Sequence, residues 1–313
     1  MTSRNGPVLA YGELLWDVLP SEAVLGGAPA NFTYRLQSLG QPARVVSRIG
    51  RDQLGNRALE QLHHLGVDAS LIQRDDEYPT GTVDITLSAA GDASYVINTG
   101  VAYDHITLTE ELRASARNCR ALYFGSLIQR HEDSRRTLAT IIEDAGDAVK
   151  LLDLNLRRDC FSLATVETSL QHADILKLNH QEAAVIAEML RLTARTLPEF
   201  AQQIMSRFSI HTCLITRAEQ GVYARSIDGQ ETTQAGYEVP VVDTIGSGDS
   251  FTAAFLQAFL AGSSLELCCD AGNRLGALVA QRKGGMSPIE PGEVAAFALP
   301  QRALDERTMR LGA

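Results

Sequence analysis

Short apolar runs alternate along the chain with longer segments in which apolar residues recur every three or four positions. The short runs are typical of strands buried on both faces, and the longer segments are typical of helices that bury one face. We expect strands at 7–12, 43–50, 121–124, 149–154, 175–178 and 212–216. We expect helices at 28–40, 53–65, 133–144, 166–171, 181–190 and 197–208. This alternation predicts an α/β fold with a mostly parallel central sheet between helices.

The segment 81–100 has a different period, because apolar and polar residues alternate on both sides of Gly91 and Asp92. This pattern predicts a β-hairpin with one polar face. We interpret the hairpin as part of a lid over a site, with residues 15–24 as a partner strand. A decorative edge hairpin is the alternative. Since no linker or repeat divides the sequence, we expect a single domain over residues 1–313.

A third pattern joins a strand-like run, 237–243, to an apolar helical segment, 250–262, through Gly246, Ser247 and Gly248. Glycines permit a sharp turn whose N–H groups converge, and the positive end of the helix dipole lies at the same place. The stretch therefore predicts an anion hole suited to a phosphoryl group in transfer.

Asp249 follows this turn directly. A carboxylate repels phosphate, so it is a poor phosphate ligand, but it can remove the proton from an alcohol that attacks phosphorus. The alternative is that Asp249 only caps the helix. The stretch lacks the GxxxxGK of a Walker loop and the third glycine of a dinucleotide fingerprint, and the first strand and turn lack GxGxxG, which argues against a nicotinamide oxidoreductase.

A second glycine-rich stretch, GGAPAN, opens the first long helix and contains Gly27 and Asn31. Gly27 would allow a ligand close to the backbone, and Asn31 offers both a donor and an acceptor. Asp17 follows the first strand shortly upstream. An Asp and an Asn at such an opening can bind vicinal hydroxyl groups, although each residue alone is more often a turn or cap residue.

Composition excludes several classes of function. The 313 residues carry a net charge of −10, which argues against a nucleic-acid or anionic-membrane partner but not against anionic ligands. No stretch has the form of a signal peptide or a membrane span. The five cysteines form no CxxC pair, so we expect reduced thiols in a cytoplasmic protein.

Together these stretches resemble the ribokinase-type (PfkB) family of carbohydrate kinases. Residues 26–50 match the N-terminal signature of the family and residues 243–256 match its C-terminal signature at every fixed position. The resemblance covers nearly the whole chain. It implies a ribokinase-like three-layer α/β/α fold with a small β lid, and an ATP-dependent kinase that uses ATP and Mg²⁺ to phosphorylate a small sugar.

The resemblance also implies roles for single residues. Asp249 is similar to the catalytic base, with the anion hole at Gly246, Ser247 and Gly248. Asp17, Gly27 and Asn31 match positions on the sugar side. Asn179 and Glu182 are similar to an NxxE motif that helps to place the phosphates and Mg²⁺, the latter through water at Glu182.

The remaining candidates lie on the nucleotide side and at a cation site. DLNLR places Arg157 after a strand end, where it is similar to a phosphate contact. Thr216 and Gly221 resemble a TxGxxG motif in which Ala218 replaces the middle glycine, and Asn273 is similar to an adenine-pocket asparagine. A monovalent-cation site, with K⁺ as a candidate cofactor, is implied at Asp243, Ile245 and Gly284.

The substrate is the finer question. GELLWD followed by GGAPAN most resembles a bacterial fructokinase-like branch, so we expect fructose, phosphorylated at its terminal hydroxyl group. Ribose, 2-keto-3-deoxygluconate and, less favoured, a nucleoside are alternatives. A sugar-binding sensor without catalysis is a rival that the base and the anion hole argue against. Lid hairpins of the family sometimes pair between subunits, so a homodimer is a further expectation.

Overall fold

The computed structural model of the chain describes residues 5–19, 22–87, 93–157 and 159–312. Within these residues nine strands form one sheet in the order β13-β12-β11-β10-β9-β8-β1-β4-β5. They are β1 (Val8–Tyr11), β4 (Ala43–Gly50), β5 (Ile72–Asp75), β8 (Ala121–Phe124), β9 (Val149–Asp153), β10 (Ile175–Asn179), β11 (Thr212–Thr216), β12 (Val222–Ser226) and β13 (Glu231–Gln234). All neighbours from β5 to β11 are parallel, whereas β12 and β13 are antiparallel. The predicted mostly parallel sheet is confirmed.

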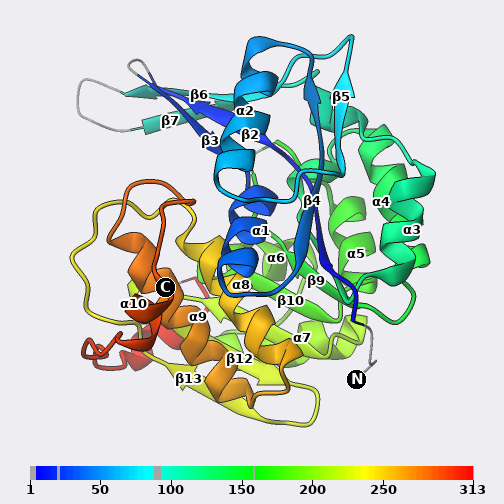
Figure 1. Cartoon of the computed structure of the whole chain (residues 1–313). Coiled ribbons are helices and arrows are strands. Elements are labelled where there is room, and N and C mark those ends of the chain that lie inside the picture. Colours follow the sequence, from blue (N-terminus) through cyan, green and yellow to red (C-terminus); the bar gives the residue numbers. More distant parts are fainter. Residues whose placement is uncertain (1–4, 20–21, 88–92, 158, 313) are drawn as a thin grey trace.

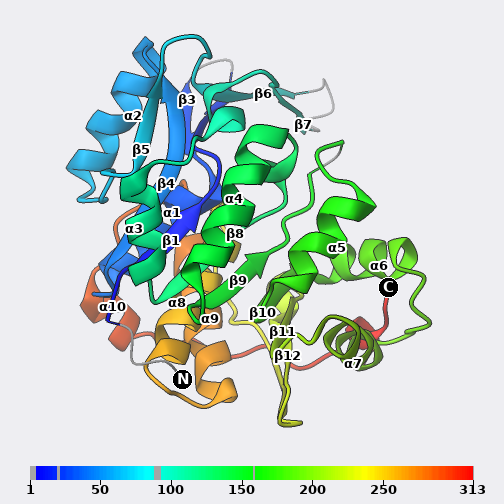
Figure 2. The ribbon, with the colours of Figure 1, turned by 90° about the vertical axis from the view of Figure 1, so that its right-hand side faces the viewer.

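Helices cover both faces of this sheet, as Figures 1 and 2 show. One face carries α1 (Ala28–Ser38), α2 (Gln53–His64), α8 (Ser247–Leu260) and α9 (Leu265–Ala280). The other carries α3 (Glu110–Asn118), α4 (Glu132–Ala145), α5 (Leu163–Gln171), α6 (His180–Met189) and α7 (Leu197–Phe208). The three-layer α/β/α arrangement is therefore confirmed. Among the helices described, none is both long and apolar enough to cross a membrane.

Shorter helices lie between these elements and near the C-terminus. They are η1 (Ala102–His105), η2 (Leu127–Gln129), η3 (Ala218–Gln220), α10 (Pro291–Ala295) and η4 (Glu306–Met309). The η1 helix comes soon after the predicted hairpin segment, and η3 interrupts the predicted nucleotide-side motif. Helices η1 and η3 thus lie next to the segments that the sequence analysis assigned to the lid and to the nucleotide side.

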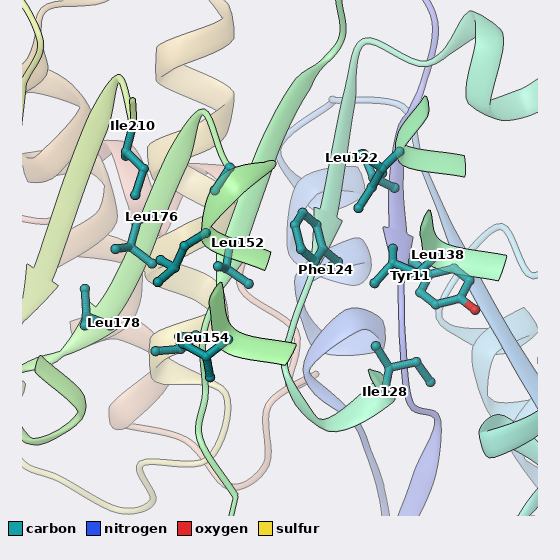
Figure 3. Close-up of a cluster of buried hydrophobic side chains, with 14 of the residues drawn as sticks. Tyr11, Leu122, Phe124, Ile128, Leu138, Leu152, Leu154, Leu176, Leu178 and Ile210 are labelled. Atoms are coloured by element: carbon teal, nitrogen blue, oxygen red, sulfur yellow. The ribbon is translucent and has the colours of Figure 1, made fainter. Parts of the chain in front are cut away.

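Two buried hydrophobic clusters hold the layers together. Alternate residues of a strand face opposite sides of the sheet, so Val8 and Ala10 pack toward α1, α8 and α9, whereas Leu9 and Tyr11 pack toward α3–α7. Figure 3 shows the cluster on the α3–α7 side, in which Tyr11 of β1 lies beside Leu138 of α4 and side chains of β8, β9 and β10 continue the cluster across the sheet. This packing gives the loops at the strand ends a rigid base.

A second, small sheet has the strand order β3-β2-β6-β7. It consists of β2 (Leu15–Val18), β3 (Ala23–Gly26), β6 (Gly81–Leu87) and β7 (Ala93–Ile97). Strand β2 pairs in parallel with β6, and β6 pairs antiparallel with β7. The small sheet projects from the α/β body in Figure 1. The predicted turn at Gly91 and Asp92 lies outside the described residues, as do residues 20–21.

Two expectations close to Asp249 are wrong. Residues 237–243 form no strand; Tyr237 makes only an isolated bridge to Gln301, and Val241 and Val242 are exposed. The β12–β13 hairpin, which the sequence pattern did not predict, already occupies that edge of the sheet. Helix α8 begins at Ser247 and not at residue 250. Its N-cap residue is Gly246, so the glycine turn ends there and Ser247 already lies in the first turn of the helix.

Candidate active site

Several predicted site residues lie at the carboxyl ends of neighbouring parallel strands. Asn179 is the last residue of β10 and is in register with Thr216, the last residue of β11. Arg157 follows the end of β9, the neighbour of β10 on its other side. The carboxyl ends of parallel strands form the usual ligand-binding edge of an open α/β sheet. The fold therefore gathers these residues from separate parts of the chain.

Asp249 and Asn31 are in direct contact. Nδ2 of Asn31, on α1, donates a hydrogen bond of 2.8 Å to Oδ2 of Asp249, in the first turn of α8. Asn31 is buried and Asp249 is half-buried. The two candidates, which are 218 positions apart in the sequence, thus belong to one site.

The surroundings of Asp249 suit a base. Burial, and then the negative charge of Asp153, raise the pKa of Asp249 to about 6. The hydrogen bond from Asn31 and the positive charge of Lys177 act in the opposite direction. A carboxylate with this pKa is ionised at neutral pH and is more basic than an ordinary aspartate, as proton abstraction from an alcohol requires.

The turn before α8 requires glycine. Gly246 is the N-cap residue with φ 74°, and a Cβ atom placed there would lie 2.4 Å from Cα of Gly285. Both the positive φ and the close approach exclude a larger residue without distortion. The turn thus packs against the loop that contains Gly285, and this contact sets the direction of α8.

The donors at this turn differ in availability. The N–H group of Ser247 donates to the carbonyl oxygen of Thr244 at 3.1 Å. For the N–H groups of Gly248 and Asp249, the described part of the chain provides no backbone acceptor, as expected in the first turn of a helix. Of the donors predicted for the anion hole, the N–H group of Gly248 is therefore free of a backbone acceptor, and the N–H group of Asp249, which was not predicted, is a further free donor beside it.

We expect Gly246→Ala to damage this turn. The change should lower kcat by about 10²-fold, because it displaces the anion-hole donors. Gly262→Ala is a matched control, since Gly262 follows the other end of α8 with φ 82° and has no atom within 4 Å of the added Cβ. The control should cost only about 1 kcal/mol of stability and leave kcat unchanged. Denaturant unfolding and steady-state kinetics measure both effects, and equal kcat values in the two variants would contradict the assignment.

Sequence reasoning missed Lys177, which lies on β10 and is 8% exposed. Its Nζ atom is 2.9 and 3.1 Å from the carboxylate oxygens of Asp153, and Thr252 Oγ1 donates to the same carboxylate at 3.1 Å. Nζ also lies 3.4 Å from the position of a Cβ added to Gly248. Burial acts to lower the pKa of Lys177, but the charges of Asp153, Glu182 and Asp249 and the hydrogen bond to Asp153 together raise it above its ordinary value. The one available signal was a lysine within an apolar strand.

Sequence reasoning also missed Glu13, a buried acidic residue. Burial raises the pKa of Glu13 to about 7, although backbone groups and the positive charge of Arg157 act in the opposite direction. The charge of Arg157 also acts on Asp17, whose pKa is raised by burial. Gly27, with φ 111°, lies so close to Glu13 that an added Cβ would be 2.4 Å from its carbonyl oxygen. The main chain at Glu13 therefore requires glycine at position 27, whether or not a ligand binds there.

Asn179 and Glu182 cap the start of α6 reciprocally. Asn179 Oδ1 accepts from the N–H group of Glu182 at 2.9 Å, and Glu182 Oε2 accepts from the N–H group of Asn179 at 2.8 Å. Glu182 Oε1 accepts from Leu156 N–H at 2.8 Å, next to Arg157. Since both carboxylate oxygens already accept backbone N–H groups, the donor set fits a hydrated Mg²⁺ ion that meets Glu182 through water.

The other nucleotide-side candidates lie around the end of β11. Ala218 adopts φ 50°, so the turn that glycine makes in the family motif forms here with alanine in the left-handed region. A Cβ added to Gly221 would be 2.5 Å from the carbonyl carbon of Ala235, and Asn273 Nδ2 donates to the carbonyl oxygen of Ala235 at 3.4 Å. The structure therefore brings Gly221 and Asn273 together beside Thr216.

Asp243 joins the two loops of the predicted cation site. Its Oδ1 atom accepts from the N–H group of Ile245 at 3.0 Å, and its Oδ2 atom accepts from the N–H group of Gly284 at 2.9 Å. These contacts lie immediately before Gly246 and its neighbour Gly285. The three candidates are therefore together, at the base of the anion-hole turn.

Comparison with known proteins finds a family and relatives that match most of the chain. The model of the pfkB family carbohydrate kinases matches residues 10–291. The fructokinase of Escherichia coli is 29% identical over 304 residues, which cover 91% of this chain and 96% of that protein.

Solved structures show the same fold. Fructokinase with bound ATP from Xylella fastidiosa has a TM-score of 0.81 at 21% identity, covering 93% of this chain and 97% of the other. A double mutant of fructokinase from Vibrio cholerae O395, bound to fructose, ADP and potassium ion, has a TM-score of 0.79 at 21% identity, covering 95% and 99%. At this level of identity, the similarity to these two structures concerns the fold.

Proposed function

The chain belongs to the pfkB family of carbohydrate kinases, and on this premise we propose that it is a fructokinase. As a member of the family it is an ATP-dependent kinase of a small sugar and uses a divalent metal ion. The proposed reaction transfers the γ-phosphate of ATP to the terminal hydroxyl group of fructose. The choice of fructose is supported by relatives such as the Escherichia coli fructokinase.

One observation carries the proposed mechanism: Asp249 lies at the start of α8, beside free helix N–H groups, and Asn31 holds one of its oxygens. Oδ2 of Asp249 accepts from Asn31, so Oδ1 is the atom that takes the proton of the attacking hydroxyl group. The N–H groups of Gly248 and Asp249 stabilise the charge on the transferring phosphoryl group. The oxygen of the sugar then attacks phosphorus, and ADP leaves.

The small sheet is proposed to act as a lid over the sugar. Asp17 lies on β2 of this sheet and feels the charge of Arg157, which follows β9 of the central sheet. Sugar hydroxyl groups bound by Asp17, near Gly27 and Asn31, would therefore connect the small sheet to the α/β body. Closure excludes water, which prevents hydrolysis of ATP and strengthens the electrostatic interactions in the site.

Two metal ions belong to the proposal. Mg²⁺, when bound with ATP, neutralises phosphate charge, and Glu182 and Asn179 would hold it through water. K⁺ is proposed beside Asp243, Ile245 and Gly284, supported by the potassium ion named for the Vibrio cholerae structure. There it would fix the loop that precedes Gly246.

The remaining proposals concern assembly and location. We propose a homodimer through the small sheet, because Tyr95 and Val96 on its edge strand β7 are 63% and 56% exposed. A second copy of the sheet could cover these apolar side chains. A cytoplasmic location is proposed because all five cysteines are buried and the sequence contains no CxxC pair.

A coupled ADP-release assay tests the substrate. With ATP and Mg²⁺ we expect kcat/KM for fructose to exceed that for ribose, 2-keto-3-deoxygluconate and adenosine by about tenfold or more, a difference of about 1.4 kcal/mol in transition-state binding. Asp17→Asn should raise KM for the sugar and leave KM for ATP unchanged.

The outcomes separate two questions. A higher kcat/KM for another sugar would replace fructose but keep the kinase, whereas no turnover on any sugar would contradict the proposed reaction. An equal rise of both KM values in Asp17→Asn would remove Asp17 from the sugar site.

A further inference from the structure

His105, His131 and Asp133 converge outside the proposed active-site residues, where η1 faces the start of α4. One donor atom from each side chain lies within 4.8 Å of the other two. We propose that these three side chains bind a divalent transition-metal ion of the zinc type. The inference is independent of the proposed fructokinase activity, because none of the three residues has a role in that reaction.

The distances fit a tetrahedral ion. Nδ1 of His105 lies 2.8 Å from Oδ2 of Asp133, and Nδ1 of His131 lies 3.6 Å from the same oxygen. Ligand bonds of about 2.0–2.1 Å in a tetrahedral zinc site separate the ligand atoms by about 3.3 Å. The two observed distances lie on either side of this value, so small side-chain movements admit an ion.

The donor types favour zinc and similar metals. Two imidazoles and one carboxylate suit Zn²⁺, Ni²⁺ or Cu²⁺, whereas Mg²⁺ and Ca²⁺ require oxygen ligands. The side chains of His131 and Asp133 are 44% and 38% exposed, so solvent can supply the remaining ligand and the ion can enter. Such a site is chemically distinct from the proposed Mg²⁺ position at Glu182.

The ligands are held in place before an ion binds. The ring of His105 stacks on Tyr78 with centroids 3.7 Å apart, and the carbonyl oxygen of His105 accepts from Arg48 Nη1 at 2.8 Å. His131 is the N-cap residue of α4, and Asp133 lies in the first turn of the same helix. Because secondary structure and packing already order these groups, binding requires little loss of conformational entropy.

A substitution of Arg136 is expected to increase metal affinity, whereas substitutions of the three ligands are expected to decrease it. Its Nη2 atom lies 2.7 Å from Oδ1 of Asp133, so it occupies one carboxylate oxygen and leaves Oδ2 for the ion. The positive charge of Arg136 repels a bound cation and competes for Asp133. Removal of this charge should therefore strengthen metal binding, an effect that a general loss of structure would not produce.

An ion at this place would connect the small sheet to the α/β body. His105 ends η1, which soon follows β7, and His131 is the N-cap residue before α4. Arg130, beside His131, donates to the carbonyl oxygen of Asn98 at 2.7 Å, just after β7. The proposed ion would add a second link between the same two segments and stabilise the base of the small sheet.

Zinc affinity of the chelator-treated full chain, measured by competition with a chromophoric chelator, tests the proposal. We expect one Zn²⁺ per chain at this site, an affinity lower by about tenfold or more in His131→Gln and Asp133→Asn, and a higher affinity in Arg136→Gln. His211→Gln is the matched control, because His211 pairs with Asp174 at 3.6 Å and the residues that the structure describes place no third metal ligand beside this pair. It should leave the affinity unchanged.

Co²⁺ absorption adds a readout of geometry, since a tetrahedral ion absorbs far more strongly than an octahedral one. Circular dichroism melts of the metal-free variants check that each is folded. Equal affinity in wild type and His131→Gln would overturn the site, as would an equal loss in His211→Gln or a lower affinity in folded Arg136→Gln.

Discussion

Asp249→Asn is expected to lower kcat by about 10³-fold, with little change in KM for sugar or ATP. Asparagine has the same shape and can still accept the hydrogen bond of Asn31, but it cannot take the proton of the attacking hydroxyl group. Steady-state kinetics on the preferred sugar measure the loss. Thr109→Ala is a control for simple loss of a helix cap, because Thr109 Oγ1 accepts from Leu112 N–H at the start of α3. It should cost about 1 kcal/mol of stability and leave kcat unchanged.

The pH profile gives a second readout of Asp249. The base must be ionised, so kcat/KM should fall as pH decreases through about 6, the raised pKa of Asp249. The residual activity of Asp249→Asn should lack this limb. A wild-type limb at the ordinary aspartate value of about 3.9 would contradict the assignment of Asp249 as the base.

The same residue should reduce stability at neutral pH. The pKa of Asp249 is raised on folding, from 3.8 to about 6, so the folded chain binds this proton more tightly and loses stability as pH rises across that interval. Asp249→Asn should therefore raise the free energy of unfolding at pH 8, by on the order of 1 kcal/mol, and have little effect below pH 4. Denaturant unfolding at the two pH values measures this difference. A variant less stable than wild type at pH 8 would indicate a structural role instead.

Lys177→Met should have the second large effect. It leaves Asp153, which is 0% exposed, without its cationic partner and should lower the free energy of unfolding by about 3–5 kcal/mol. It also removes a positive charge that lowers the pKa of Asp249, so the acid limb of kcat/KM should move above 6. Lys150→Met is a matched control, since Lys150 lies 4.0 Å from Asp174 near the surface and should cost about 1 kcal/mol or less.

A double variant separates stability from catalysis. Asp153→Asn combined with Lys177→Met removes both buried charges and should restore much of the lost stability. Because Asp153 raises and Lys177 lowers the pKa of Asp249, the acid limb should also return toward its wild-type position. If kcat of this stable double variant is lower than that of wild type, the charge of Lys177 itself supports phosphoryl transfer. A kcat equal to that of wild type would limit Lys177 to balancing Asp153.

Local patterns were sufficient for much of the fold. The parallel strands are buried on both faces and therefore read as continuous apolar runs, as Ala121–Phe124 and Thr212–Thr216 do. Edge strands carry no such run, which explains why Glu231–Gln234 was missed. The valines of 237–243 had the composition of a strand, but the β12–β13 hairpin extends that side of the sheet, and this segment makes only the isolated bridge of Tyr237 to Gln301. Pairing partners decide such cases, and a local window does not contain them.

Residues close together in the chain were enough to predict the α/β layers, the glycine turn before α8 and the candidate base at Asp249. Only the folded arrangement shows that Asn31 contacts Asp249, that Lys177 pairs with Asp153, and that His105 lies beside His131 and Asp133. Apart from His131 and Asp133, which are near neighbours in the chain, the residues in these contacts are separated by 24 to 218 positions. The physical reason is that pKa values and ligand geometry depend on burial and on charges brought close by folding, which periodicity along a sequence does not record.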